Sequence, residues 1–254
     1  MLLAVDIGNT QTVLGLFQGE SLSHHWRMAT EAHRSADELA VFINGFLGLA
    51  EVTRSEVDGF VLASVVPLLT GEYERMCRRH FGLEPLIVGP GVRTGMPIRT
   101  SNPDEVGPDL IADAVAAYAF YGGPAVVVDF GTATTVGAVS ERGEYLGTAI
   151  APGIRVSLEA LIARAARLRT VELADPGTVI GKSTAHSLRA GVVYGFAGQV
   201  DGLVRRMKAE LGGTVAVVAT GGLSSLVVLH CETVEHEDPY LTLRGLRLIA
   251  ERNG

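Results

Sequence analysis

The sequence predicts an α/β protein made of two halves of the same architecture, each a mixed β-sheet with flanking helices. Short apolar runs typical of buried strands alternate with helical segments along the whole chain. A strand that ends in the pattern Asp-x-Gly-x-x-x-Thr occurs twice. The second copy lies 123 residues after the first, so that Asp6, Gly8 and Thr12 recur as Asp129, Gly131 and Thr135. Hydrophobic residues make up 47% of the 254 residues, which is enough for a core of good size.

In the first half, apolar runs predict strands at residues 2–6, 12–17, 21–30, 60–66 and 84–88. Helices are expected at residues 35–49 and 68–80. The first of these has apolar side chains at helical spacing, and Ser35 with Glu38 forms a capping box at its start. Residues 89–106 are rich in Gly, Pro, Thr and Asn and predict a loop. We place the domain boundary at its end, which gives domains 1–106 and 107–254.

The second half opens as the first does, after a helix expected at residues 107–121. Strands are predicted at residues 124–129, at the apolar run that follows, and at 145–151 and 215–219. Helices are predicted at residues 157–168, 184–211 and 240–251. Residues 211–231 contain no Asp, Glu, Lys or Arg, a length typical of a membrane span. Paired glycines interrupt this stretch, so we expect a buried strand, a glycine turn and a short helix instead.

Composition excludes several classes of protein. The chain has 21 Lys and Arg against 28 Asp and Glu, and this net charge of −7 argues against general nucleic-acid binding. Cys77 and Cys231 lie far apart and form no C-x-x-C motif, so we expect two reduced thiols, with a disulfide as the unsupported alternative. The start of the chain lacks the pattern of a signal peptide. We therefore expect a cytoplasmic protein that does not enter a membrane.

The repeated strand-Asp-x-Gly turn has the chemistry of a phosphate and cation site. A carboxylate at a strand end can hold a metal ion directly or through water, and glycine permits a turn whose backbone N–H groups face a phosphate. Threonine hydroxyls in and beside the two turns are candidate donors to phosphate: Thr10, Thr12, Thr132, Thr134 and Thr135. Two such turns facing one another would hold a polyphosphate and its cation. The alternative is a pair of plain hairpins in which Asp and Gly only serve the turn.

The segment Asp6-Ile-Gly-Asn-Thr10 resembles the first phosphate motif of the superfamily of acetate and sugar kinases, Hsp70 and actin. More narrowly, the chain is similar to the type III pantothenate kinases. Further segments that carry this resemblance are Gly107-Pro-Asp-Leu110, Asp129-Phe-Gly-Thr132, Ala149-Ile-Ala-Pro-Gly153, Ile180-Gly-Lys-Ser-Thr184 and Thr220-Gly-Gly222. The resemblance implies two ribonuclease-H-like (actin-like ATPase) domains per subunit and a homodimer. It also implies ATP-dependent phosphorylation of pantothenate to 4'-phosphopantothenate, the first step of coenzyme A biosynthesis.

The resemblance also implies roles for individual residues. The ATP phosphate loop would consist of Asp6, Ile7, Gly8, Asn9, Thr10, Gln11, Thr12 and Val13, with Thr132 as a further ATP contact. Pantothenate would contact Gly107, Pro108, Asp109, Leu110 and Thr184. Asp109 would be the general base, Asp129 would bind a monovalent cation (K⁺ or NH₄⁺), and Asp6 would lie near Mg²⁺. Taken from its position alone, Asp109 is an acid at a helix N-terminus, which the helix dipole stabilises.

One position departs from the family pattern. The family usually has Gly-x-Asp-Arg where this chain has Leu110 after Asp109, and leucine cannot supply the charge and forked donors of a guanidinium. Arg93, Arg99 and Arg155 are candidates to replace that arginine. The alternative is a catalytically impaired family member that binds a ligand or partner without turnover. A kinase for another small hydroxyl-bearing acid is a third hypothesis.

Four glycines form a stripe on the long helix expected at residues 184–211. Gly191, Gly195, Gly198 and Gly202 follow one another at steps of four, three and four, so they share one face. Each costs about 1 kcal/mol of helix propensity relative to Ala, which predicts close packing of another element on the stripe. That element is either a second subunit, as the resemblance implies, or the domain's own sheet.

Overall fold

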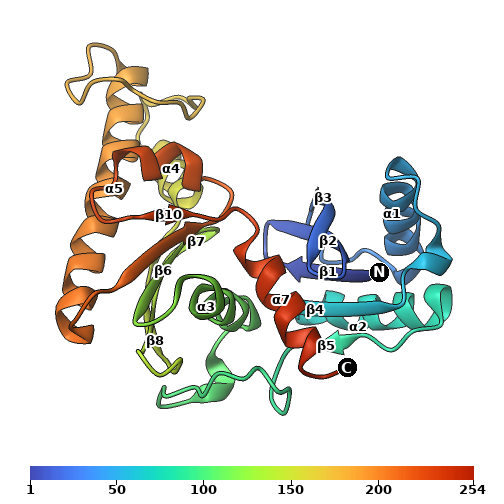
Figure 1. The fold of residues 1–254 in the computed structure, drawn as a ribbon. Coiled ribbons are helices and arrows are strands. Elements are labelled where there is room, and N and C mark those ends of the chain that lie inside the picture. Colours follow the sequence, from blue (N-terminus) through green and yellow to red (C-terminus); the bar gives the residue numbers. More distant parts are fainter. The chain divides into compact units, whose positions relative to one another are not determined.

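The computed structural model describes all residues, 1–254, and divides into two compact units. The first unit comprises Met1–Pro97, Ser101–Ala116 and Leu241–Gly254, and the second comprises Ile98–Thr100 and Ala117–Tyr240. These bounds differ from the expected division after residue 106. The C-terminal helix α7 (Leu241–Glu251) belongs to the first unit because its apolar side chains are buried on the strands of that unit (Figure 1).

The first unit is built on a five-stranded sheet of order β3-β2-β1-β4-β5. Its strands are β1 (Leu2–Ile7), β2 (Gln11–Gln18), β3 (Ser21–Ala29), β4 (Gly59–Ser64) and β5 (Leu86–Ile87). Strands β1, β2 and β3 pair antiparallel with one another, whereas β4 and β5 run parallel to β1. The helices are α1 (Ala36–Leu49), α2 (Pro67–Met76) and α7, and a π-helical turn (Cys77–Phe81) continues α2. Leucine, isoleucine and aromatic side chains of the sheet, α1 and α2 form one core.

The start of α1 has the capping box expected from the sequence. The Ser35 hydroxyl accepts a hydrogen bond from the backbone N–H of Glu38. The Glu38 carboxylate in turn accepts one from the backbone N–H of Ser35, at 2.8 Å. Two amides that the helix cannot satisfy internally are thereby paired.

The second unit repeats this sheet, with strand order β10-β9-β6-β7-β8. Its strands are β6 (Ala125–Phe130), β7 (Ala133–Val139), β8 (Tyr145–Pro152), β9 (Ala216–Thr220) and β10 (His236–Glu237). Again the hairpin strands are antiparallel and the last two strands run parallel to the first. The helices of the unit are α4 (Ile154–Arg164), α5 (Thr184–Leu211) and α6 (Ser224–Val227), while α3 (Pro108–Tyr121) has its first nine residues in the first unit. The two sheets thus share order and directions, which confirms two ribonuclease-H-like domains.

The uncharged segment 211–231 forms what the sequence predicted: strand β9, a turn at Gly221-Gly222 and the short helix α6. No helix of the structure is both long and apolar enough to cross a membrane. Strand β10 was not expected, because its two residues are polar and show no strand pattern.

The glycine stripe of α5 does not pack on its own sheet. A Cβ placed on Gly191, Gly195 or Gly198 would meet no atom within 4 Å, and one on Gly202 would meet only the end of the Arg206 side chain. The opposite face of α5 is buried against β6 and β7. Of the two elements proposed to cover the stripe, the domain's own sheet is therefore excluded.

Candidate functional site

The first candidate phosphate turn joins β1 to β2. Asp6 is half-buried near the end of β1, and the three residues of the turn follow, with Asn9 and Thr10 exposed. The turn is closed by the backbone N–H of Gly8, which donates to the carbonyl oxygen of Gln11 at 3.1 Å. A Cβ on Gly8 would lie 3.0 Å from that oxygen, so glycine lets the turn close tightly. The exposed part of this loop is thus mainly backbone and short polar side chains.

The second candidate turn joins β6 to β7 and has close neighbours from two other segments. The backbone N–H of Gly153, the N-cap of α4, donates to the carbonyl oxygen of Thr132 at 3.2 Å. Gly221, at the end of β9, lies against the Asp129 carboxylate, where a Cβ would clash, and its φ of +97° also favours glycine. A Cβ on Gly131 would lie 3.1 Å from the other oxygen of the same carboxylate. Two glycines therefore pack closely on the Asp129 carboxylate, where a side chain would not fit.

The five threonines proposed as phosphate donors fall into two groups. Thr10 and Thr132 lie in the turns and are exposed. Thr12, Thr134 and Thr135 are buried within their sheets. The hydroxyl of Thr12 shares a hydrogen bond of 2.9 Å with that of Thr30, so it fastens the sheet. Only the two turn threonines are accessible donors in this structure.

Asp109 lies in the first turn of α3, directly after Pro108 at the helix start. Its Oδ1 accepts a hydrogen bond from the backbone N–H of Leu110 at 2.9 Å. Burial raises the pKa of the Asp109 carboxyl above its ordinary value, and the hydrogen bond from Leu110 opposes part of this rise. Gly107 packs against the carboxylate, since a Cβ there would overlap Oδ1. Asp109 and the Gly8 turn belong to the same compact unit.

The other predicted site residues, Asp129, Thr132 and Thr184, belong to the second unit. So do Arg99 and Arg155, two of the three arginines proposed to replace the one that the family has at position 110. Thr184 is the first residue of α5 and is exposed. Arg99 forms an ion pair of 2.7 Å with Glu144. Arg155, in the first turn of α4 after Gly153, is exposed and has no ion pair. The third arginine, Arg93, belongs to the first unit, where Asn253 holds its backbone through two hydrogen bonds. Of the three arginines, Arg155 is thus the one that is both exposed and near a candidate turn.

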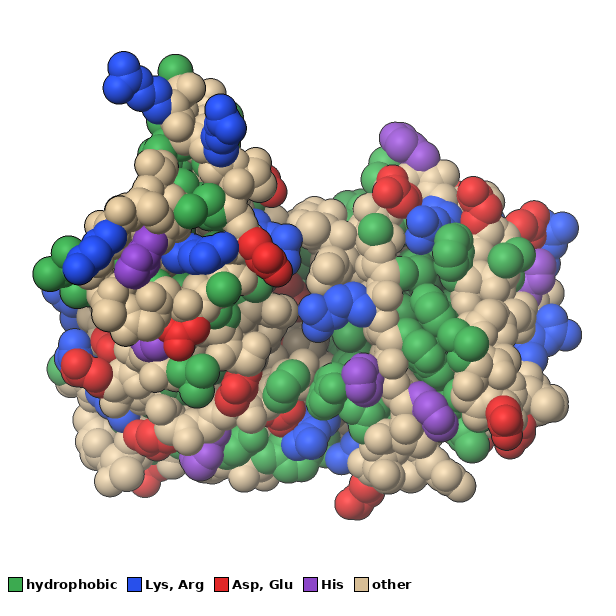
Figure 2. Space-filling view, turned by 90° about the horizontal axis from the view of Figure 1, so that it is seen from above, with side chains coloured by type: hydrophobic (Ala, Val, Ile, Leu, Met, Phe, Trp, Pro, Cys, Tyr) green, Lys and Arg blue, Asp and Glu red, His purple; other side chains and the backbone are tan.

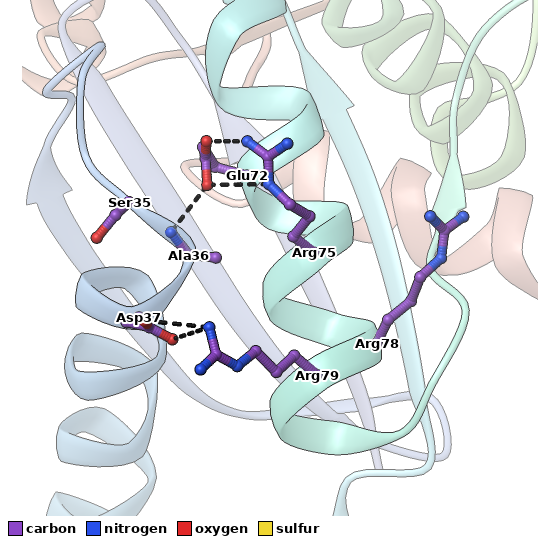
Figure 3. A pocket seen from close by; sticks show the side chains of 7 residues that line it. All are labelled: Ser35, Ala36, Asp37, Glu72, Arg75, Arg78 and Arg79. Carbon is purple, nitrogen blue, oxygen red and sulfur yellow. Dashed lines mark hydrogen bonds and ion pairs between the residues drawn. The ribbon is translucent and has the colours of Figure 1, made fainter.

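A pocket of about 490 Å³ in the first unit is not part of this site (Figure 3). It lies between the start of α1 and helix α2, and none of the predicted site residues lines it. Its charged side chains are all paired: Glu72 with Arg75, Asp37 with Arg79 at 3.2 Å, and Arg78 with Glu84, outside the pocket, at 2.8 Å. Glu72 also accepts from the backbone N–H of Ala36 at 2.9 Å. These contacts tie the two helices together and leave the pocket without an unpaired charge of its own to bind a ligand.

The sequence interpretation assigned no role to Gly153 and Gly221, although both lie in segments that carry the family resemblance. The structure places both directly against the second turn. The signal for Gly221 was the glycine pair that follows a buried strand, where a positive φ is common. No local pattern marks Gly153, because its contact partner, Thr132, comes from another hairpin.

The surface and the metal-ligand geometry limit the chemistry. On the face in Figure 2, Lys and Arg side chains are interspersed with acidic ones and form no continuous basic patch. No group of three or more His, Cys, Asp and Glu side chains is placed to hold a metal ion. A metal at either turn would therefore need a ligand's oxygens besides a single carboxylate, which is how Mg²⁺ binds in many phosphate-transfer sites.

Comparison with known proteins identifies the family. The family model described as type III pantothenate kinase matches residues 2–206. Type III pantothenate kinases of Thermobifida fusca and Moorella thermoacetica are 55% and 53% identical to this chain, each aligned over all of both chains. Among solved structures, a Campylobacter jejuni protein described as a conserved Baf family transcriptional activator matches with a TM-score of 0.60 at 21% identity. That match spans 99% of this chain and 98% of the other, and at this identity it speaks for the fold alone.

The sequence matches extend through both units and include every segment that carries the phosphate turns and Asp109. They give no support to the alternative that Leu110 marks a member without turnover. The chain belongs to the type III pantothenate kinase family.

Proposed function

We propose that this chain transfers the γ-phosphoryl group of ATP to the primary hydroxyl of pantothenate, giving 4'-phosphopantothenate. Besides membership of the family, the main support for this proposal is the environment of the Asp109 carboxylate. It is half-buried at a helix start, in the same unit as the Gly8 turn, and its carboxylate is held by a backbone N–H. Enzymes that transfer phosphoryl groups act mainly by positioning the two substrates and neutralising phosphate charge. They also need one group that accepts the proton of the attacking hydroxyl. Asp109 is that group in our proposal.

The ATP phosphates would lie on the backbone of Asp6 to Val13 in the first unit and on Thr132 in the second. The exposed N–H groups and hydroxyls of the two turns are suitable donors for phosphate oxygens. Pantothenate would contact the start of α3, from Gly107 to Leu110, and Thr184.

The two aspartates at the strand ends fit different ions. Mg²⁺ prefers oxygen ligands from one or two carboxylates together with substrate phosphates, which suits the single carboxylate of Asp6. Asp129 has two glycines, Gly131 and Gly221, packed closely on its carboxylate, so its surroundings differ from those of Asp6, and we assign it to a monovalent cation, K⁺ or NH₄⁺. When bound, these ions would neutralise phosphate charge, while the protein residues orient the two substrates.

Arg155 is our candidate for the guanidinium that Leu110 lacks. It is exposed, has no ion pair, and follows Gly153, which touches the turn at Thr132. If Arg155 supplies the missing charge, Arg155→Ala lowers kcat by about 10²-fold, as does loss of other charge-stabilising donors. Leu110→Arg added to that variant is then expected to restore activity in part.

We also propose a homodimer in which α5 meets a second copy of the chain. The glycine stripe faces open space, although each of its glycines costs helix stability. The same unit also exposes large aliphatic side chains, namely Ile150, Leu161, Val179 and Ile180. Sedimentation should give the mass of two chains of 26.8 kDa. A Gly195→Glu variant should give one folded chain, and a wild-type monomer would contradict this assembly.

The function is tested by incubating the protein with ATP, Mg²⁺, K⁺ and pantothenate and detecting the product by mass. We expect 4'-phosphopantothenate, with no product when ATP or pantothenate is omitted. Other small hydroxyl-bearing acids should react much more slowly. Absence of product from a folded protein, or faster phosphorylation of another acid, would contradict the proposal.

Asp109→Asn tests the base. The amide cannot take a proton, so we expect kcat to fall by about 10²-fold or more. Burial penalises the charged carboxylate, so the variant should keep or raise Tm. Asp104→Asn, at an exposed aspartate of the preceding 3₁₀ turn, is the matched control and should behave as wild type.

The pH dependence follows from the same carboxyl. The base must be ionised, and its pKa is raised above 3.8, so the acid limb of kcat/KM should lie above that of an ordinary aspartate. An acid limb at or below pH 3.8 would contradict the assignment.

A further inference from the structure

Helix α7 contacts two parts of the first unit: the strands that flank the Gly8 turn, and helix α3, which carries Asp109. It packs on β1 and β2, the strands on either side of the Gly8 turn, and on β4. Leu243 of α7 lies against Gly15 of β2, where a Cβ would come within 2.8 Å of the leucine. On another side α7 lies against α3, whose first turn holds Asp109 (Figure 1). The C-terminal helix therefore joins the strands of the phosphate turn to the helix of the base.

Two residues on one face of α7, Thr242 and Gly245, contact α3. The Thr242 hydroxyl donates a hydrogen bond of 2.7 Å to Oδ1 of Asp113. Gly245, three residues further along α7, packs on the backbone of Ala112, where a Cβ would overlap the carbonyl oxygen. Residues three apart lie on one helix face, so the hydrogen bond and the glycine contact belong to the same helix pair. This contact sets both the distance and the rotation of α3.

Asp113 links that contact to the base. It follows Asp109 by four residues, so the two carboxylates lie on one face of α3, a turn apart. Its side chain is only 3% exposed. A buried carboxylate is costly unless it is hydrogen-bonded, so the bond from Thr242 stabilises this rotation of α3. A rotation of the helix that breaks this hydrogen bond would also move Asp109.

We propose that Thr242 is a positioning residue, which acts through Asp113 to hold the Asp109 carboxylate in place relative to the Gly8 turn. This inference rests on the proposed function, in which Asp109 accepts the proton of the attacking hydroxyl. The role is separate from substrate binding, since Thr242 is hydrogen-bonded to Asp113, one turn further along α3 than Asp109. Thr242 lies 129 residues after Asp113 in the sequence, so this proposal gives the C-terminal helix a role in the reaction.

The test is Thr242→Val, which keeps the shape of the side chain and removes its hydroxyl. We expect kcat for phosphopantothenate formation to fall about tenfold or more, because a small displacement of a reacting group is costly in rate. KM for ATP and for pantothenate should stay within about threefold of wild type, since both binding surfaces remain. Thr242→Ser restores the hydroxyl and should recover kcat to within about twofold.

Thr148→Val is the matched control. Thr148 is a half-buried threonine of β8 whose hydroxyl donates to the carbonyl oxygens of Val136 at 3.0 Å and of Ala149 at 3.3 Å, away from α3 and α7. It should lower Tm as much as Thr242→Val does and leave kcat unchanged. Equal kcat in the two valine variants would overturn the inference. If Thr242→Val does not fold, as judged by circular dichroism, Thr242→Ala takes its place in the same comparison.

A double variant separates positioning from a general effect on the enzyme. If Thr242 acts through Asp109, then Asp109→Asn with Thr242→Val should be no slower than Asp109→Asn alone. A further tenfold loss in the double variant would contradict the inference. A wild-type protein without product, or an Asp109→Asn variant with full kcat, would instead show that the proposed function or its base is wrong, and the inference would fall with it.

Discussion

The two hairpins β1–β2 and β6–β7 start alike and close differently. In both, a buried strand carries a half-buried aspartate, and a glycine follows two residues later. Three residues separate β1 from β2, whereas two separate β6 from β7. Asp6 therefore pairs with Val13, while Asp129 pairs with Thr135. The repeat of 123 residues, which aligns Thr12 with Thr135, is thus one residue out of step after the turn.

Strand pairing shows the true counterparts. Thr12 lies opposite Ile7, and Thr134 lies opposite Phe130, so these two threonines are equivalent, and both are fully buried. The residue directly after the third strand differs between the two sheets: it is Thr30 in the first and Gly153 in the second. The backbone N–H of Thr30 donates to Thr10 in the first, and that of Gly153 donates to Thr132 in the second.

This single exchange changes what surrounds each turn. The hydroxyl of Thr30 pairs with that of Thr12, whereas Gly153 has no side chain and the hydroxyl of Thr134 has no hydrogen-bond partner. The first hairpin is fastened by its own side chains. The second instead accepts the close backbone approach of Gly153 and of Gly221 beside Asp129. The two sheets thus share one topology, while the two turns differ in how closely other backbone segments approach them.

The largest expected effect is that of Gly153→Ala. A Cβ there would overlap the carbonyl oxygen of Thr132, a backbone atom that cannot turn away. We expect a cost of about 1–3 kcal/mol, seen as a Tm lower by about 3–10 °C, together with a raised KM for ATP. Gly137→Ala is the control in the same sheet, since the nearest neighbour of its added Cβ would lie 3.5 Å away, an ordinary contact distance.

The equivalent change in the first hairpin is Thr30→Ala, which removes a hydroxyl and adds no clash. It should cost about 1–2 kcal/mol, because the buried hydroxyl of Thr12 then loses its hydrogen bond with Thr30. If the Tm of Gly153→Ala is no lower than that of Gly137→Ala, the second turn does not require a glycine at position 153. The proposed difference between the two hairpins would then be wrong.

A smaller effect, of opposite sign in the two hairpins, is expected from replacing the buried threonines. Thr12→Val breaks the hydrogen bond with Thr30 and should destabilise the protein by about 1 kcal/mol. Thr134→Val removes a buried hydroxyl without a partner, so stability should stay the same or rise by up to about 1 kcal/mol. Thermal unfolding of both variants under one condition measures the difference. A Thr134→Val variant less stable than Thr12→Val would contradict it.

Much of the fold was predictable because its signals are local. Buried strands, the capping box at Ser35 and the long helix from Thr184 to Leu211 all appear where periodicity and caps indicate them. The repeated Asp-x-Gly pattern also predicted two domains of one architecture. Strand β10 was missed because two polar residues carry no pattern, and its place depends on pairing with β9.

The candidate site was predictable only in part. Residues of the turns and of the start of α3 can be named from motifs, but burial separates Thr10 and Thr132 from the other threonines, and sequence spacing does not show burial. The one-residue shift after the turn depends on strand register. The return of α7 to the first unit, with its hydrogen bond from Thr242 to Asp113, joins segments whose proximity no local pattern encodes.

We propose that the two copies of this hairpin bind different ions, and cation titration of two variants tests this proposal most directly. Phosphopantothenate formation is measured against K⁺ at saturating Mg²⁺, and against Mg²⁺ at saturating K⁺, for wild type, Asp6→Asn and Asp129→Asn. We predict that Asp129→Asn raises the K⁺ concentration for half-maximal rate about tenfold or more and leaves that for Mg²⁺ unchanged, with the reverse for Asp6→Asn. Variants that shift the same ion, or an Asp129→Asn variant that titrates K⁺ as wild type does, would contradict the account.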